Sequence, residues 1–540
     1  MSASKQQKHR DRKRKLRNAQ RRIRHRLRER AGAPQDRPMF RARNIYYEIA
    51  DKARGLACGG IGMIHTLARA VGLIEAIDDR LHLLKIHLPY HESDHVLNMA
   101  YNVLAGGTCL DDLELLRNDE VYLDALGAPR IPDPTTAGDF CRRFSPVDVR
   151  ILQDTIHRVR RDVWAQQPRS FFDEATLDVD GSLAQTYGER KQGMGMAYDG
   201  TWGYHPLIVS LRQTQEPLYL INRPGNRPSH EGAAEYLDAA ARLCDQAGFR
   251  RVTFAGDTDF SQTTHLDRWH EQQRRFVFGL DAMPNLVQIA NHLPASRWRL
   301  LPRPPKYEVK TVPRGRRENV KEQIVRMNGY KNIRLQAEHV AEFRYRPIAC
   351  RRTYRVVVVR KHLSHEQGQS RLFEDYRYFF YLTNDMAGAD AITAGRISTP
   401  AELVHVANER CQQENLIEQL KNGVHALRMP AGDLTSNEAY MVMASLAWTL
   451  KAWFALLLPE PGSVAPKGMA AALARWGERY GDEKRAVLRM EFKTFLNAFM
   501  RVPCQLVRSG RRLIFRLLSW NPWQSVLLRG LDALATPQRC

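Results

Sequence analysis

One stretch of the chain, residues 170–289, limits the possible folds because short strand-like runs alternate there with helical periods. The strand-like runs are rich in β-branched, aromatic and other apolar residues. A helical period separates the third run from the fourth, and a shorter one separates the fourth from the fifth. The five predicted strands are Ala175–Asp180, Tyr204–Arg212, Pro217–Arg223, Arg251–Asp257 and Arg275–Asp281.

Three strands, a helix, a strand, a helix and a strand is the order of a ribonuclease-H-like α/β fold. In that fold the first and fourth strands lie side by side. Asp180 and Asp257, which close these two strands, would then emerge together at one edge, where an open α/β sheet places its sites. We therefore expect a ribonuclease-H-like catalytic core in this part of the chain.

The charge balance indicates a polyanionic partner. The formal net charge is +23, with 82 Lys and Arg residues against 59 Asp and Glu. Such an excess favours binding to nucleic acid, because cationic side chains release the counterions that surround the phosphates. A basic protein that is merely soluble is the alternative. We predict double-stranded DNA as the partner.

The N-terminal tail is the most basic segment. Its first thirty residues hold fourteen Lys and Arg against Asp11 and Glu29. Such a run repels itself, so we expect it to be disordered alone and to become helical on DNA. A solvated tail that aids solubility is the alternative. The cations expected to touch DNA are Arg12, Lys13, Arg14, Lys15, Arg21 and Arg22, together with Arg316 and Arg317 of a second basic stretch.

The length of 540 residues exceeds what one hydrophobic core usually serves, so several domains are expected. Helical periods flank the core, and two strong strand runs, Tyr354–Arg360 and Tyr376–Leu382, predict a β-rich insertion. A plain helical bundle is the alternative to DNA binding for the first helical region. The predicted divisions are a basic tail (1–45), a helical DNA-binding region (46–169), the first part of the core (170–289), the β-rich insertion (290–397), a core helix (398–424) and a helical C-terminal region (425–540).

The positions of the cysteines and of the apolar segments argue against a zinc-stabilised, a secreted or a membrane-spanning protein. The eight cysteines lie far apart without a CxxC pair, which disfavours a structural zinc site and fits a reducing interior. The N-terminus lacks the apolar segment of a signal peptide. Tyr440–Leu458 is apolar, but it is short for a membrane span and carries Lys451, so we interpret it as a buried core helix. No membrane contact is expected.

Two acidic residues stand near the end of the first predicted strand. Asp178 and Asp180 are two positions apart and could face the same side. Asp180 precedes Gly181 and Ser182, where the backbone can approach a metal ion and a phosphate, so Asp180 is favoured and Asp178 stays open as the alternative ligand. On the fourth strand Asp257 is favoured over Asp259, which lies in the loop beyond.

A third acidic residue, Glu414, lies on a predicted helix over 400–421. Thr399-Pro-Ala-Glu402 is a capping box with proline at the first helical position. At about 100° per residue, Arg410, Glu414 and Lys421 share one face. Apolar residues on that face turn it toward the protein, where a charge must be paired or bind a metal. A surface ion pair between Arg410 and Glu414 is the alternative.

These motifs resemble those of the bacterial insertion-sequence transposases with an Asp-Asp-Glu catalytic domain. The matching features are an Asp-Gly-Ser strand, a later strand with Asp-Thr-x-Phe, and a helix with Arg, Glu and Lys at the family's spacing. Ala407 stands where that family has a tyrosine. The segments 203–207 and 223–226, and the β-rich insertion, are similar to the insertion-sequence thirteen-eighty branch in particular.

The resemblance implies a cut-and-paste transposase that cleaves transposon ends and joins them to target DNA. Asp180, Asp257 and Glu414 would bind two Mg²⁺ ions, with Mn²⁺ able to substitute, while Arg410 and Lys421 would hold phosphates. It further implies a homodimer in the synaptic complex and a bacterial cytoplasmic, nucleoid-associated protein. Trp202 is the candidate for holding a flipped base, and a partly buried strand-entry aromatic is its alternative.

Two other functions fit the same residues. A catalytically silent DNA-binding protein derived from a transposase would recognise DNA without cutting it. A structure-specific nuclease of the same fold would hydrolyse DNA without joining strands.

Overall fold

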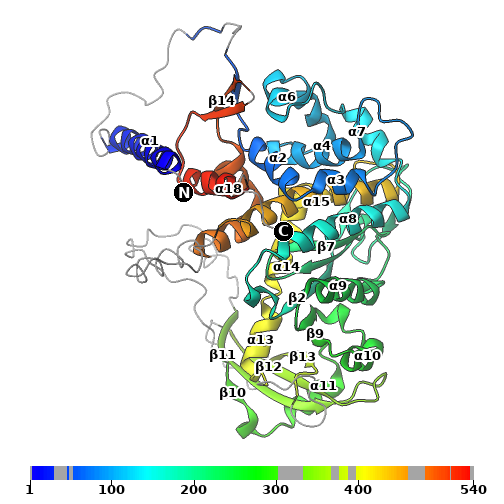
Figure 1. Cartoon of the computed structure of the whole chain (residues 1–540). Helices are drawn as coiled ribbons and strands as arrows, with labels where there is room; N and C mark the ends of the chain where they lie inside the picture. The colour runs from blue at the N-terminus through cyan, green and yellow to red at the C-terminus, as the bar shows by residue number, and fades with distance from the viewer. Residues whose placement is uncertain are drawn as a thin grey trace.

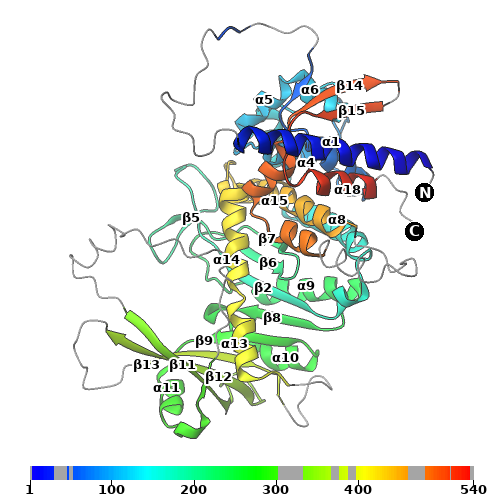
Figure 2. The ribbon, with the colours of Figure 1, turned by 90° about the vertical axis from the view of Figure 1, so that its left-hand side faces the viewer.

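The computed structural model describes residues 3–28, 45–47, 53–301, 333–365, 376–386, 397–459, 481–510 and 512–534. Across these ranges the protein is a mixed α/β structure with one large sheet and many helices (Figure 1). The sheet occupies the middle and one end of the molecule, and the N-terminal and C-terminal helices gather at the other end (Figures 1 and 2).

The large sheet has nine strands in the order β10-β11-β12-β13-β9-β8-β2-β6-β7. Five of them form the predicted core, each within a few residues of its expected bounds. The core strands are β2 (Ala175–Gly181), β6 (Leu207–Leu211), β7 (Glu216–Ile221), β8 (Val252–Gly256) and β9 (Arg275–Leu280).

The first and fourth core strands are neighbours, as the sequence predicts. β2 runs parallel to β8, with Asp178 opposite Ala255, and β8 runs parallel to β9. On its other edge β2 pairs antiparallel with β6, and β6 with β7. The helices α9 (Ala233–Ala247) and α10 (Leu266–Glu271) connect the parallel strands. This arrangement brings the ends of β2 and β8 together.

The predicted strand Tyr204–Arg212 was wrong in one respect, because it is divided at Pro206. Proline has no amide hydrogen for a sheet ladder. The first part, β5 (Trp202–Tyr204), leaves the large sheet and lies between β3 (Ala184–Gln185) and β4 (Gly195–Met196) in a small sheet of its own. The second part continues as β6.

The β-rich segment extends the core sheet instead of forming a separate layer. β13 (Tyr376–Thr383) pairs antiparallel with β9, and β12 (Tyr354–His365) and β11 (Ile333–Tyr345) follow outward. The short β10 (Arg299–Leu300) completes that edge. Helix α11 (Pro284–Asn291) connects β9 to this part of the sheet. Arg316 and Arg317 lie outside the described residues.

A bundle of helices precedes the core. They surround α15 (Leu434–Leu456), which contacts α4 and α8 most extensively. One continuous hydrophobic cluster joins these helices, the core sheet and the C-terminal elements. The helices are α2 (Ile61–Ala70), α3 (Leu73–Asp78), α4 (Glu92–Ala105), α5 (Leu113–Arg117), α6 (Glu120–Leu126), α7 (Pro134–Cys141) and α8 (Pro146–Trp164).

Helix α15 confirms the interpretation of Tyr440–Leu458 as a core helix. Its length and composition alone would suit a membrane span, but its apolar window is entirely buried inside the protein. A buried carboxylate, Glu216, fixes this helix to its surroundings. It accepts hydrogen bonds from the indoles of Trp453 on α15 and Trp164 on α8, at 2.8 and 2.9 Å, and pairs with Arg160 at 3.0 Å.

The expectation of a disordered tail was wrong for residues Ala3–Arg28, which form helix α1. This range contains neither proline nor glycine, and Arg, Lys, Gln and Leu are good helix formers. The helix lies beside α18 (Gln524–Leu534), where Arg12 pairs with Asp532 at 2.7 Å (Figure 2). Local helix propensity therefore outweighs the repulsion between like charges here.

The prediction of a purely helical C-terminal region was also wrong. After α17 (Phe492–Phe495) the chain forms a hairpin of β14 (Cys504–Ser509) and β15 (Arg512–Leu517). β14 also pairs with β1 (Gly55–Leu56), so the hairpin joins the two ends of the helical bundle. Side chains of higher and lower burial alternate along β15 and the first part of β14, which is a strand period and not a helical one.

Candidate active site

The predicted continuous helix over 400–421 is interrupted in the structure. α13 (Pro400–Asn408) ends before Arg410, α14 (Cys411–Glu418) begins after it, and a π-helical turn, Gln419–Gly423, follows. The predicted capping box is confirmed, because the Glu402 amide donates to the Thr399 hydroxyl at 3.2 Å and the Thr399 amide to the Glu402 carboxylate at 2.7 Å. The two helices lie end to end along the sheet (Figure 2).

A hydrogen bond from a residue far away in the sequence lies at the interruption. In a continuous helix the Arg410 amide would donate to the Val406 carbonyl. Arg212, directly after β6, donates to that carbonyl at 2.8 Å, and the Arg410 amide donates to the Ala407 carbonyl at 3.4 Å. The sequence prediction missed this because no local signal marks the break.

Three carboxylates reach one point from three elements. Asp180 lies near the end of β2, Asp257 follows β8 and caps the short turn Thr258–Phe260, and Glu414 lies in the first turn of α14. Gly279 of β9 allows the turn after Asp257 to pack closely, since a Cβ at this glycine would lie 2.9 Å from the Thr258 amide nitrogen. Two neighbouring strand ends and one helix therefore bring the three acids together.

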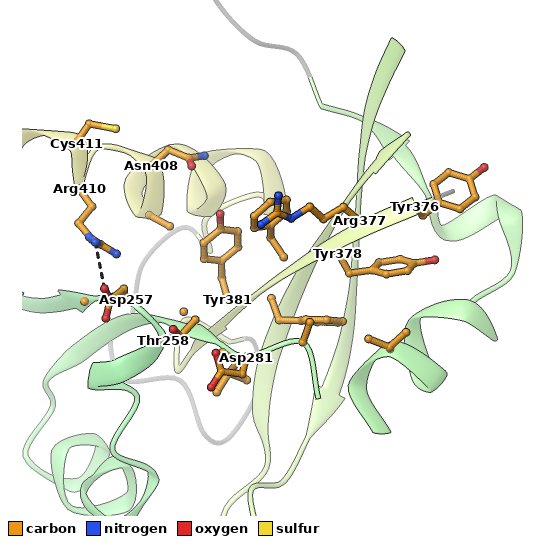
Figure 3. Close-up of a pocket in the computed structure, with 18 of the residues that line it drawn as sticks. Asp257, Thr258, Asp281, Tyr376, Arg377, Tyr378, Tyr381, Asn408, Arg410 and Cys411 are labelled. Carbon is orange, nitrogen blue, oxygen red and sulfur yellow. Dashed lines mark ion pairs between the residues drawn. The ribbon is translucent and has the colours of Figure 1, made fainter. Parts of the chain in front are cut away.

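The guanidinium of Arg410 lies among these acids. Its Nη2 atom is 3.2 Å from Asp257 Oδ2, 3.5 Å from Asp180 Oδ2 and 3.7 Å from Glu414 Oε1. Figure 3 shows Arg410 pointing from its helix toward Asp257. Because one nitrogen is close to all three, any two of the carboxylates are separated by no more than the sum of two of these distances. Arg410 therefore lies close to three carboxylates, whereas the alternative of a surface ion pair would involve Glu414 alone.

The carboxylates lie in surroundings that disfavour their negative charge. The pKa of Asp180 is raised to about 7, chiefly by burial, with the charge of Arg410 opposing the rise and the neighbouring Asp257 adding to it. Burial likewise raises the pKa of Asp257, against the opposing charge of Arg410. One guanidinium thus offsets the burial of these negative charges only in part. A divalent cation would favour the ionised carboxylates more strongly.

Asp178, the alternative ligand, is already engaged. Its side chain is 1% exposed, and both its oxygens accept hydrogen bonds from Arg212, at 2.8 and 2.5 Å. Asp180 lies two residues farther along β2, next to Arg410. The geometry therefore favours Asp180 over Asp178 as the acid that faces the site.

A cavity of about 810 Å³ opens beside the acids. Asp257, Arg410 and Glu414 line one end, and the cavity continues along β9 and β13 toward Tyr376 (Figure 3). Aromatic side chains of β13, including Tyr378, line the far part. The space is large enough to admit a segment of a polymeric substrate to the acids.

The other predicted site residues lie farther out. Lys421 is half-buried in the π-helical turn, where burial lowers its pKa and the charges of Glu418 and Asp180 partly restore it. Trp202 is 43% exposed on β5, opposite Met196, and does not line the cavity. The predicted cations of the tail, from Arg12 to Arg22, lie on α1.

The acids as they stand do not form a finished metal site. Among the described residues, no group of three His, Cys, Asp or Glu side chains is close enough together to hold a metal ion. The Arg410 guanidinium occupies the space between the acids. The donor set nevertheless fits a hard cation, since it consists of carboxylate oxygens that already surround a positive charge.

Two functional candidates were missed by the sequence analysis. Arg212 and Gln413 contact neither the cavity nor the acids directly, yet both fasten the interrupted helix to the sheet. An arginine closing an apolar strand run requires a buried partner, which was the available signal for Arg212. For Gln413, in a helix, the sequence offers no comparable signal.

Comparison with known protein families decides which family these features belong to. The family profile described as transposase DDE domain group 1 matches residues 56–538. The chain belongs to this family. DDE transposases act on DNA in transposition and recombination and generally use divalent metal ions, so this transposase is a mixed α/β enzyme of that class.

Other comparisons add little to the assignment of the transposase. No curated protein matches it. The cryo-EM structure of a piggyBac transposase synaptic complex with hairpin DNA aligns over 83% of this chain and 82% of that chain, with 8% sequence identity and a TM-score of 0.34.

Proposed function

We propose that this transposase cuts the ends of a mobile DNA element and joins them to target DNA. Asp180, Asp257 and Glu414 are the proposed metal ligands and catalytic residues. The observation that carries the proposal is the convergence of these three carboxylates on the single nitrogen Nη2 of Arg410. Two Mg²⁺ ions are proposed, with Mn²⁺ as a substitute, because carboxylate oxygens are the ligands that both ions accept.

Bound metal would supply Lewis-acid stabilisation of the phosphoryl oxygens and a nucleophile activated at neutral pH. The chain's own part is to hold the three carboxylates on rigid elements, two at strand ends and one on a helix. Arg410 has to leave the centre of the acids before metal can enter. Its planar fork suits a phosphate, and Lys421, near Asp180, adds a second cation.

The core is proposed to be ribonuclease-H-like. Its support is the strand order, in which the second and third strands extend one side of the first and the parallel fourth and fifth strands extend the other. Membership of the insertion-sequence thirteen-eighty branch, a bacterial origin and a cytoplasmic, nucleoid-associated location are proposed on the motif resemblance alone.

DNA is the proposed partner, recognised first by charge. Helix α1 carries cations along its whole length, and the chain has a net charge of +23. A basic helix can neutralise several phosphates and release their counterions. We propose that α1, with the N-terminal helices, binds the element's ends. A synaptic homodimer and a base-holding role for Trp202, which exposes part of its indole, belong to the same proposal.

The test uses purified protein and a plasmid that carries the DNA flanking the reading frame on both sides. Mg²⁺-dependent nicking at the ends of the element, followed by joining to a second plasmid, is the expected result. Binding without cleavage would indicate a silent DNA-binding protein. Cleavage without joining would indicate a structure-specific nuclease, so a strand-transfer assay separates the remaining two functions.

A further inference from the structure

We infer that Arg212 and Gln413 are positioning residues, which fix the break between α13 and α14 and thereby aim Arg410 and Glu414 at the strand-end acids. The inference rests on the proposed function. It goes beyond it by assigning a role to two side chains that touch neither metal nor DNA in that proposal. Their contacts are with the backbone and with other buried groups.

Arg212 holds the first helix. Its Nε and Nη2 atoms donate to both oxygens of Asp178, and its Nη1 atom donates to the Val406 carbonyl at 2.8 Å. The same Nη1 is 3.6 Å from Glu409. Arg212 and Asp178 are 6% and 1% exposed, so neither side chain can easily exchange these partners for water. The pair therefore fixes the end of α13 against β2 and β6.

Gln413 holds the second helix. It is 1% exposed, and its amide donates to the Ile208 carbonyl of β6 at 3.2 Å. Its side-chain oxygen accepts a hydrogen bond from the Ser210 hydroxyl. Ser210 lies directly opposite Asp178 in the β2–β6 pair, so the two anchors are attached to neighbouring positions of the sheet.

The two anchors flank the residues that matter for the site. Between Val406 and Gln413 the helix breaks and Arg410 turns toward the acids, and Glu414 follows Gln413 directly. A reacting group displaced by about 1 Å can lose about a hundredfold in rate. Loss of either anchor would loosen the segment around the break, and Glu414 and Arg410 would move with it.

The test compares Gln413→Met with a matched control, Gln153→Met. Gln153 of α8 is also buried, and it too connects a helix to a strand by two hydrogen bonds. Its side-chain nitrogen donates to the Leu220 carbonyl, and its side-chain oxygen accepts from the Leu220 amide. Both variants should lower the thermal unfolding midpoint by similar amounts. With the flanking-DNA plasmid, Gln413→Met should cleave about ten- to a hundredfold more slowly and need more Mg²⁺ for half-maximal rate, whereas Gln153→Met should stay within about threefold of wild type.

Two further measurements exclude a general folding defect. DNA binding in EDTA should be equal for both variants, and amide hydrogen exchange should accelerate at 406–413 in Gln413→Met alone. If Gln413→Met does not fold, Ser210→Ala removes one of the same hydrogen bonds and should show the same pattern. Equal cleavage by the Gln413 and Gln153 variants would overturn the positioning role while leaving the proposed function intact, whereas a wild-type protein that binds but never cleaves would overturn the proposed function.

Discussion

Arg410 Nη2 and Asp257 Oδ2 lie 3.2 Å apart, and the same nitrogen serves Asp180 and Glu414 as well. The guanidinium therefore stands where a metal ion shared by these acids would have to be. Arginine and metal exclude each other from this position, so entry of the metal requires departure of the side chain. A phosphate of bound DNA is the natural partner for the displaced guanidinium.

The first prediction concerns this exclusion. Arg410→Ala should bind Mn²⁺ at least about tenfold more tightly than wild type in the absence of DNA, which corresponds to about 1.4 kcal/mol. The bound ion can be followed by electron paramagnetic resonance. Lys421→Ala removes the same charge near Asp180 without vacating the centre, so its gain should be smaller. Equal gains in both variants would mean that Arg410 acts only through its charge.

The second prediction concerns the acid at the end of β8. Asp257→Asn should cut DNA more than about a hundredfold more slowly, because even groups that only support metal ligands are worth 10–100-fold. Binding of the flanking DNA should be unchanged. Asp259→Asn is the control, since Asp259 is exposed two residues away. A gel assay of plasmid nicking measures both, and normal cutting by Asp257→Asn would remove this residue from the proposed site.

The third prediction concerns the buried carboxylate that fastens α15. Glu216→Ala should reduce the free energy of unfolding by about 3–5 kcal/mol, because Arg160 would be left buried without its partner and two indoles would lose their acceptor. Asp139→Ala breaks an exposed pair with Arg142 and should cost less than about 1 kcal/mol. Urea unfolding followed by tryptophan fluorescence provides the comparison. Similar losses in the two variants would contradict the role assigned to Glu216.

The fourth prediction concerns pH. Burial raises the pKa of Glu438, on α15, to about 7, so the folded state holds a proton that the unfolded state releases near pH 4.5. The stability from this proton is complete below pH 4.5 and is lost as the pH rises to about 7. Glu438→Gln cannot ionise, so above pH 7 it should be more stable than wild type by up to about 3 kcal/mol. Unfolding midpoints at pH 4.5 and 8 test this, and a gain of equal size at both would contradict it.

The core strands and the acids that close them followed from the sequence because both depend on local patterns. Strand periods and the βββαβαβ order are enough to place Asp180 and Asp257 on adjacent strands. The helix break could not be predicted in this way. It depends on Arg212, a residue 194 positions before Val406, whose guanidinium takes a carbonyl that the helix would otherwise use.

The structure differs from the sequence-based expectation in two other places, and there too residues far apart in the chain come into contact. The tail was expected to be disordered from its charge, yet α1 forms where helix propensity is high and α18 offers Asp532 as a partner. The C-terminal hairpin pairs with β1, from the opposite end of the chain. Such pairings depend on the assembled fold, and no window of sequence contains both partners.

The continuous pairing of β13 with β9 has a mechanical consequence for this enzyme. Tyr381 lies opposite Gly279, the glycine on which the Asp257 turn is packed. The outer strands cannot swing like a lid without breaking ladder hydrogen bonds beside that turn. A force exerted on these strands by a bound duplex would instead be transmitted through the sheet to the backbone that carries Asp257.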